Sequence, residues 1–334
     1  MSRENNNHSA IGIDIGTSRI VVARRLNGED RFESQLNAFL TVPCSKLAAA
    51  TFDKEKIPHK LVDGHILVYG NESERLADLF SGETRRPMLR GMLNPDEKES
   101  LDRIRDILVS LLGDTKKTTQ RICFSVPAPA LNGADDLRYH ETALRQVLQE
   151  FGSEVTSINE GLAVVFGELQ NENFTGVGVS CGGGMCNVCL SYLAMPVFSF
   201  STPKAGDFID ASTASVTGEN STRIRVIKEK SFHLNGHYVD KIHRAICIYY
   251  DEMIANLANG IAESFARFKS IPNLDRPIPM VISGGSSMPE GFRERVEKAI
   301  AAVDVPVKFS EIRMASEPLH ATARGALAAA TAEL

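Results

Sequence analysis

Two stretches of the sequence repeat one pattern, in which a short apolar strand, a tip of small residues and a second strand follow each other. The first, IGIDIGTSRIVVARR, covers residues 11–25 and turns at Gly16, Thr17 and Ser18. The second, TGVGVSCGGGMCNVCLSYL, covers residues 175–193 and turns at residues 182–184, which are all glycine. Two similar hairpins about half a chain apart indicate two related lobes that hold one phosphate chain between them.

The first hairpin carries the residue types of a phosphate and metal site. A glycine followed by two hydroxyl residues leaves backbone N–H groups free at the tip, and such groups bind anions. Asp14, one residue before the strand ends, is then placed to hold a hydrated divalent cation beside the phosphate. The alternative is an ordinary hairpin whose aspartate faces solvent, because a short motif does not decide between the two by itself.

Length and composition are those of a globular protein with room for two lobes, since the chain has 334 residues, 43% hydrophobic and 24% charged. A net charge of -5 and the lack of a lysine-arginine run argue against nucleic acid as the main partner. The first ten residues are polar, without the apolar core of a signal peptide, and no apolar run approaches membrane-spanning length. We therefore expect a cytoplasmic protein.

Cysteine spacing offers a competing interpretation. Cys181, Cys186, Cys189 and Cys247 match the spacing of plant-type iron–sulfur proteins. If the stretch is a hairpin, however, Cys186 and Cys189 point to opposite faces of one strand and do not share a cluster. The six cysteines of the chain lie mostly inside apolar strand or helix patterns and are therefore expected to be reduced and buried.

The rest of the chain reads as alternating strands and helices around these hairpins. Residues 33–87 predict a small inserted subdomain, and RRPMLRGML at residues 85–93 predicts a turn region. Amphipathic or small-residue patterns predict helices at residues 94–112 (capped by Asn94 or Asp96), 137–151, 208–216, 218–230, 238–258 or beyond, 290–302 and 317–334. Buried strands are predicted at residues 122–126, at 155–158 and at 279–283, directly before a double glycine.

Three of these segments carry candidate site residues. The strand at 155–158 delivers Glu160 to its carboxyl end, where α/β proteins place their chemistry, so Glu160 can orient a water molecule. Alternatively, Glu160 is an ordinary glutamate in the first turn of a helix, where its charge complements the helix dipole. The basic stretch 218–230 either reaches a nucleotide base or ribose or forms a solvated charged face. Gly284 and Gly285 let the backbone lie flat against a planar ring.

Six motifs in order, IDIGTS, INEGLAVVFG, VSCGGGMCNV, KAGDFID, VISGGSSM and EPLHATARGAL, resemble the actin and heat-shock-chaperone ATPase superfamily over nearly the whole chain. Within it, the chain is most similar to the bacterial actin MreB and its relatives. The resemblance implies an α/β fold of two lobes, each ribonuclease-H-like, with a nucleotide cleft between them. It also implies ATP or ADP and Mg²⁺ as cofactors. The implied site residues are Asp14, Gly16, Thr17 and Ser18 for phosphate and magnesium, Gly182, Gly183 and Gly184 for the second phosphate loop, Asp207 near the nucleotide, Gly284, Gly285 and Ser286 for adenosine, and Glu160 for the attacking water.

The chain departs from the family pattern at the second phosphate loop. Ser180 stands where the family carries an aspartate, Met185 and Cys186 replace threonines, and Gly161 replaces the proline after the glutamate. Losing a carboxylate beside the metal removes negative charge that helps to hold it. Nucleotide binding is expected to survive, because backbone amides supply most of it, and hydrolysis is expected to be slow.

The resemblance also implies a domain division and a function. The division is 1–170 for lobe I, with an inserted subdomain at 33–92 and the helix 317–334 packing back on it, and 171–316 for lobe II, with an inserted helical subdomain at 215–275. The function is a cytoskeletal protein that self-associates into filaments with ATP, with weak ATPase activity at most. The alternative is a non-polymerising ATP-dependent switch that acts on a protein partner. The asparagine-rich N-terminus has no apolar face, so no direct membrane anchor is expected.

Overall fold

Each of the two glycine-rich hairpins forms the centre of a five-stranded sheet. The computed structural model describes residues 9–80, 82–113, 120–131, 133, 137–268 and 276–332. In the first hairpin, Ile13 lies opposite Val22 and Ile15 lies opposite Ile20. In the second, Val179 lies opposite Val188, and Cys181 lies opposite Cys186 on the two sides of the glycine-rich turn. Both predicted hairpins are confirmed.

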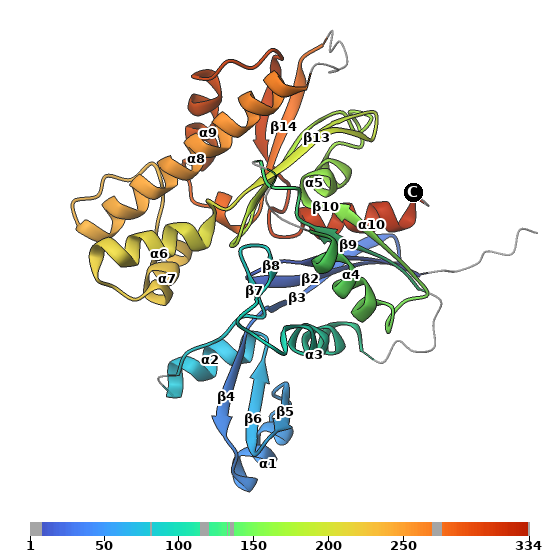
Figure 1. The fold of residues 1–334 in the computed structure, drawn as a ribbon, viewed down its shortest axis with the longest axis vertical. Coiled ribbons are helices and arrows are strands. Elements are labelled where there is room, and N and C mark those ends of the chain that lie inside the picture. Colours follow the sequence, from blue (N-terminus) through green and yellow to red (C-terminus); the bar gives the residue numbers. More distant parts are fainter. Residues whose placement is uncertain are drawn as a thin grey trace, which may run out of the picture.

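The two sheets have the same strand order and the same strand directions. The first contains β1 (Ser9–Ile15), β2 (Arg19–Leu26), β3 (Glu29–Leu36), β9 (Gln120–Val126) and β10 (Glu154–Asn159). The second contains β11 (Gly176–Cys181), β12 (Cys186–Tyr192), β13 (Met195–Thr202), β14 (Ile278–Ser283) and β15 (Phe309–Met314). In each, three antiparallel strands are extended by two parallel ones, in the orders β3-β2-β1-β9-β10 and β13-β12-β11-β14-β15. This shared topology confirms a duplicated, two-lobed α/β fold (Figure 1).

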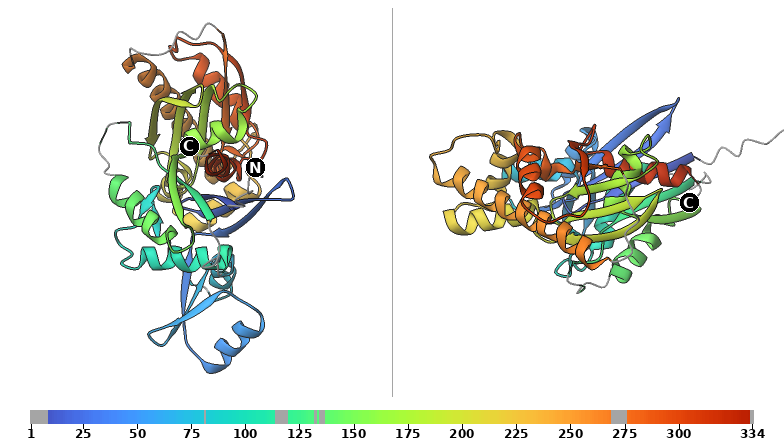
Figure 2. Two further views of the ribbon diagram at one scale, coloured as in Figure 1. Left: turned by 90° about the vertical axis from the view of Figure 1, so that its right-hand side faces the viewer. Right: turned by 90° about the horizontal axis from the view of Figure 1, so that it is seen from above.

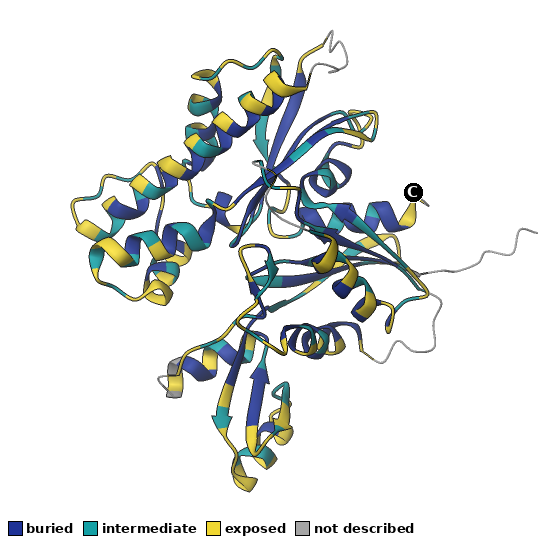
Figure 3. Cartoon of the chain, viewed as in Figure 1, coloured by how far each residue is buried: buried dark blue, intermediate teal, exposed yellow. Residues whose placement is uncertain are grey.

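Helices cover both faces of the sheets. They are α1 (Lys46–Lys54), α2 (Asn71–Phe80), α3 (Ser100–Leu112), α4 (Leu137–Leu148), α5 (Glu160–Glu168), α6 (Gly206–Thr217), α7 (Ser221–Lys230), α8 (Lys241–Arg267), α9 (Phe292–Ala301) and α10 (Ala321–Thr331). The isoleucines of β1 pack with α3 and α4 in one core, and β11, β12 and β14 pack with α6, α8 and α9 in another. Buried residues are therefore concentrated in the sheets and on the inner helix faces (Figure 3).

Helices α5 and α10 lie between the two sheets and cross at close range (Figure 1). A side chain at Gly325 of α10 would fall 1.7 Å from the carbonyl oxygen of Ala163 in α5, so the crossing requires glycine there. Helix α5 follows the last strand of the first sheet, and α10 follows the last strand of the second. The junction between the lobes is therefore built from two equivalent helices.

A small three-stranded sheet extends from the first lobe (Figure 2). It contains β4 (Phe39–Pro43), β5 (His59–Val62) and β6 (His65–Tyr69), covered by α1 and α2 around a core of its own. Because β3 pairs with β2 through Leu36, this separate sheet begins after residue 36. The segment predicted as a turn region contains a short hairpin of β7 (Met88–Leu89) and β8 (Met92–Leu93).

Several helix ends differ from the sequence prediction. Helix α3 begins at Ser100 with Glu99 at its N-cap position, so neither Asn94 nor Asp96 caps it. The reason is local, because the Asn94 side chain accepts from the Asp96 N–H and folds residues 94–99 into turns. Helix α8 begins at Lys241 rather than at residue 238, and it ends at Arg267, in agreement with the prediction that it extends beyond residue 258. No helix in the described part of the chain is long and apolar enough to cross a bilayer.

Candidate nucleotide site between the lobes

All the sequence-predicted site residues border one cavity between the lobes, with a volume of about 660 Å³. They are Asp14, Gly16, Thr17, Ser18, Glu160, Gly182, Gly183, Gly184, Asp207, Gly284, Gly285 and Ser286. They come from five separate stretches of sequence. Four of these lie at the carboxyl ends of β1, β10, β11 and β14, and the fifth, Asp207, lies in the first turn of α6. The cavity is in the size range of a site for a small organic ligand.

The first glycine-rich loop, residues 16–18, is a tight turn held from two sides. The Gly16 N–H donates to the Arg19 carbonyl at 2.9 Å, and the Asn37 side chain donates to the Gly16 carbonyl at 2.9 Å. The Gly91 N–H, at the tip of the β7–β8 hairpin, donates to the Thr17 hydroxyl at 2.8 Å. The backbone of the loop is therefore fixed by its neighbours, as an anion-binding turn requires.

The second glycine-rich loop, residues 182–184, is closed by the Gly182 N–H, which donates to the Met185 carbonyl at 2.9 Å. The start of α6 lies against this loop, because the Asp207 N–H donates to the Gly183 carbonyl at 2.7 Å. The two loops also face each other, since a side chain at Gly183 would fall 2.2 Å from the Ser18 hydroxyl. The structure thus brings both glycine-rich tips to one place.

Asp14 and Glu160 present two carboxylates to the cavity. The Ser125 hydroxyl donates to Asp14 at 2.6 Å, and the Ser180 hydroxyl donates to Glu160 at 3.0 Å. Burial raises the pKa of Asp14 to about 6, against the lowering effect of the Ser125 hydrogen bond. Burial and then the nearby Asp14 charge raise the pKa of Glu160 to about 8. Without a counter-charge the two groups therefore disfavour each other's ionisation.

This pair of groups fits a divalent cation. A bound cation would supply the positive charge that two neighbouring, partly buried carboxylates need in order to ionise together. One or two carboxylates together with substrate phosphates and water are the donors that Mg²⁺ uses. Asp14 is the carboxylate near the end of β1, directly before the first glycine-rich loop.

The opposite end of the cavity is formed by the residues after β14. The short 3₁₀ turn Gly285–Ser287 follows Gly284, and the Ser286 hydroxyl donates to the Gly182 carbonyl at 2.7 Å. The Gly284 N–H donates to the Pro318 carbonyl at 2.9 Å, which joins this turn to the loop before α10. Pro318 and Leu319 of that loop also border the cavity.

The family model for volactin matches residues 9–330, which is nearly the whole chain. The chain belongs to the volactin family. No functionally curated protein matches the sequence. Similar solved structures share the fold at low sequence identity. One is "MamK double helical filament", at 17% identity, with a TM-score of 0.72 over 97% of this chain and 99% of that one.

Two further structures are similar to this volactin. MreB5 of Spiroplasma citri bound to AMPPNP has 12% identity and a TM-score of 0.68 over 96% of this chain and 95% of that one. The ethanolamine utilization protein EutJ from Carboxydothermus hydrogenoformans has 18% identity and a TM-score of 0.56 over 98% of this chain and 92% of that one. Together they confirm the expected two-lobed, actin-like fold, as in MreB and MamK.

In this volactin the residues that depart from the actin-like pattern are packed closely. Ser180 is 4% exposed and uses its hydroxyl to hold Glu160, whereas an aspartate there would place a third carboxylate beside the site. A side chain at Gly161 would fall 2.6 Å from the backbone nitrogen of Cys189, so β12 leaves no space for one. The Cys186 thiol lies 3.4 Å from the Lys204 carbonyl.

The cysteines do not form a cluster site. Cys181 and Cys186 face each other on β11 and β12, whereas Cys189 pairs with Gly178 and Cys247 lies on α8. Consistent with this, the described part of the chain holds no cysteine-containing metal group. All six cysteines are free thiols, although Cys44 is exposed, so the expectation of burial is wrong for that residue.

Two polar residues of the site were missed in the sequence. Ser125 lies near the carboxyl end of β9, where the same rule that identified Glu160 points to site residues. Asn187 is fully buried on β12, its side-chain oxygen accepts from the Ala128 N–H at 2.7 Å, and its amide lowers the pKa of Glu160. No sequence signal distinguishes Asn187 from an ordinary strand residue.

The basic helix α7 is not simply a solvated face. Lys228 is 6% exposed and pairs with Asp210 at 2.8 Å, and both border the cavity. Arg225 forms an ion pair with Glu74 of α2, from the other lobe. The interpretation of residues 218–230 as a solvated face is therefore wrong for the side that carries these two cations, because the cavity and the facing lobe cover it.

Proposed function

We propose that this protein binds ATP with Mg²⁺ in the cavity between its lobes and self-associates into filaments in the ATP-bound state. The observation that carries the proposal is the convergence of two glycine-rich loops, Asp14 and Glu160 on one cavity of about 660 Å³. Backbone N–H groups at such loops favour phosphate, and a cavity of this size holds a nucleotide.

Each predicted site residue has a proposed role. The loops at Gly16–Ser18 and Gly182–Gly184 bind the phosphates, the turn after β14 holds the adenosine, and Asp14 holds a water-coordinated Mg²⁺. The metal supplies charge neutralisation for the phosphates. Glu160 orients the attacking water, and Ser180 orients Glu160. Asp207 stands near the nucleotide, and Arg86 of the other lobe pairs with it.

Hydrolysis is proposed to be slow. Orientation and charge neutralisation act together in phosphoryl transfer, and this site keeps Glu160 while Ser180 supplies no charge. A glutamate whose pKa is raised to about 8 is also poorly ionised at neutral pH until a cation binds.

Filament formation is supported by the fold of the similar structures. One of them is a double helical filament of MamK. Two others are structures of MreB5 of Spiroplasma citri, one bound to AMPPNP and one bound to ADP. We propose a cytoplasmic, cytoskeletal role of the same kind. We also propose the domain division into residues 1–170 and 171–316, with the C-terminal helix packing back on the first part.

Sedimentation and electron microscopy test the proposal. Purified protein with ATP and Mg²⁺, or with a slowly hydrolysed analogue, should pellet and show protofilaments, whereas protein without nucleotide should remain in the supernatant. A titration with labelled ATP on the same samples reports binding separately. If the protein binds ATP but stays monomeric at every concentration tested, the filament proposal fails and the ATP-dependent switch is favoured instead. Protein that binds no ATP overturns both.

A further inference from the structure

Helix α5 carries a carboxylate at each end. Glu160, its first residue, faces the cavity, and Glu168, its last residue, lies outside it. The Glu168 side chain is only 4% exposed. A carboxylate so deeply buried requires several hydrogen-bond donors, because an unpaired buried charge is strongly disfavoured.

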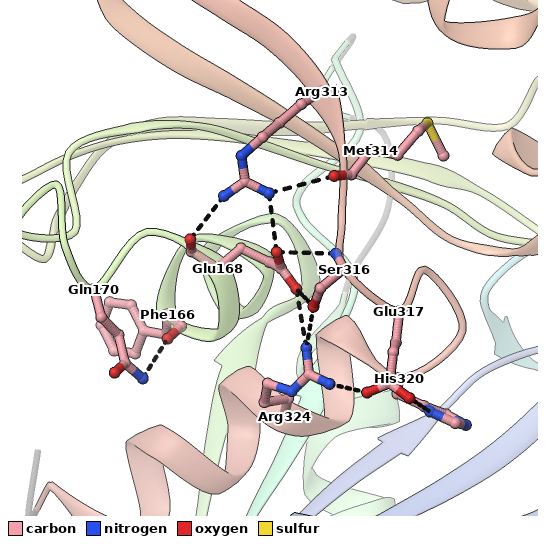
Figure 4. Close-up of polar contacts among 9 residues, drawn as sticks. All are labelled: Phe166, Glu168, Gln170, Arg313, Met314, Ser316, Glu317, His320 and Arg324. Carbon is pink, nitrogen blue, oxygen red and sulfur yellow. Dashed lines mark hydrogen bonds and ion pairs between the residues drawn. The ribbon is translucent and has the colours of Figure 1, made fainter.

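Glu168 has such donors on every side (Figure 4). Its carboxylate accepts from Arg313 at 3.0 Å and from Arg324 at 3.0 Å, and from Ser316 through the backbone N–H at 3.1 Å and the hydroxyl at 2.7 Å. Its backbone carbonyl accepts from Arg313 at 2.9 Å. These partners come from the end of β15, the loop after it and α10, so one side chain holds three elements.

The two guanidiniums also have outer carboxylate partners. Arg313 pairs with Glu311 at 3.3 Å, and Arg324 pairs with Glu317. Both outer glutamates are about half exposed, so water screens these pairs more than it screens Glu168. Glu168 is thus the central anion of the group, and its removal leaves two arginines facing each other across an empty space.

The segment that Glu168 holds forms one wall of the cavity. Residues 315–320 run from β15 to α10, and the Ala315 N–H donates to the Ile282 carbonyl at 2.8 Å. Pro318 and Leu319, two and three residues after Ser316, border the cavity beside Gly284 and Gly285. Ser316 of this segment reaches α5 through its two hydrogen bonds to the Glu168 carboxylate.

We propose that Glu168 is a positioning residue that fixes the nucleoside end of the cavity by locking residues 315–320 to α5. The proposal rests on the proposed function, in which the cavity binds ATP. It adds that the affinity for the base and ribose depends on a carboxylate that never contacts them. Phosphate binding, by contrast, depends on the two glycine-rich loops, which Glu168 does not touch.

The test compares a ligand with a nucleoside and a ligand without one. Isothermal titration measures binding of Mg-ATP and of Mg-tripolyphosphate to wild type and to Glu168→Gln, a variant of nearly the same size without the charge. We expect Mg-ATP affinity to fall about tenfold or more and Mg-tripolyphosphate affinity to stay within twofold. Equal losses for both ligands would show a general loss of structure and overturn the proposal, as would unchanged Mg-ATP affinity.

Two further variants guard against misfolding and loss of surface charge. Ser316→Ala removes one donor and leaves both arginine pairs, so it should shift Mg-ATP affinity in the same direction by a few-fold. Glu311→Gln is the matched control, because it removes a partner of Arg313 that lies outside the segment. It should leave the affinity for both ligands unchanged. If wild type binds tripolyphosphate and ATP equally, the nucleoside contributes nothing and the inference fails while a phosphate site remains. If wild type binds neither ligand, the proposed function fails as well.

Discussion

The guanidinium of Arg86 and the carboxylate of Asp207 form an ion pair of 2.9 Å that joins the two lobes beside the cavity. Arg86 precedes the β7–β8 hairpin in the first lobe, and Asp207 lies in the first turn of α6 in the second. Arg225 and Glu74 make a second bridge between α7 and α2. Under the proposed function, these two bridges restrict how far the lobes separate when a nucleotide enters or leaves.

Arg86→Ala should therefore speed nucleotide entry. Loss of one bridge lets the lobes separate more often, and we expect a severalfold faster association of a fluorescent ATP analogue in stopped-flow measurements. Asp207→Ala and the double variant complete a double-mutant cycle. If the two side chains act as a pair, the effects of the single substitutions on the association rate should be strongly non-additive. An association rate unaffected by Arg86→Ala would refute this. A much larger loss of affinity for Asp207→Ala alone would indicate direct nucleotide contact.

Asp14→Ala should weaken Mg-ATP binding at least about tenfold, or about 1.4 kcal/mol, and abolish assembly. The physical reason is the loss of the carboxylate at the end of the first phosphate loop. Binding measured with Mg²⁺ and with EDTA separates the metal effect, since the variant should lose most of the Mg²⁺ dependence. Asp53→Ala, in α1, is the control and should behave as wild type. Undiminished Mg²⁺ dependence in Asp14→Ala would place the metal elsewhere.

Ser180→Asp should accelerate hydrolysis. It restores a carboxylate beside the metal and the phosphates, and we expect phosphate release to rise about tenfold or more. Glu160→Ala should lower the rate of wild type about tenfold or more, because it removes the group that orients water. Phosphate release by all three proteins decides this point. A wild type as fast as Ser180→Asp, or a Glu160→Ala variant with normal activity, would disprove the account of the site.

His140 should make stability depend on pH. It is 1% exposed on α4, where its Nδ1 accepts from the Leu93 N–H at 3.2 Å, and burial lowers its pKa from 6.5 to about 4. The unfolded chain therefore binds the proton first, so stability falls as the pH drops from 6.5 towards 4. The loss attributable to this group is roughly 3 kcal/mol.

The measurement is urea unfolding at several pH values for wild type and His140→Asn. Asparagine keeps an acceptor but does not titrate, so the stability difference between the two proteins should shrink as the pH falls from 6.5 to 4. His65→Asn, at an exposed site, is the control for the substitution itself. A difference between wild type and His140→Asn that does not change with pH would contradict the buried, neutral histidine.

The sequence alone predicted the two hairpins and their glycine-rich tips. It also predicted the strands that end directly before Glu160 and Gly284, and most of the helices. These features are local, because alternation, helical periodicity and glycine positions act over a few residues. The order of motifs was sufficient to indicate the two-lobed actin-like fold. It also named twelve residues that border one cavity, although their chemical roles stay predictions.

Only the tertiary structure decided which distant side chains meet. Arg86 and Asp207 are 121 residues apart, Arg225 and Glu74 are 151 apart, and Glu168 and Arg324 are 156 apart. No periodic pattern carries such a pairing, since each of these residues alone resembles an ordinary exposed charge. Their positions depend on how two sheets and the crossed helices α5 and α10 pack, and that packing is set by the summed burial of many apolar residues across the chain.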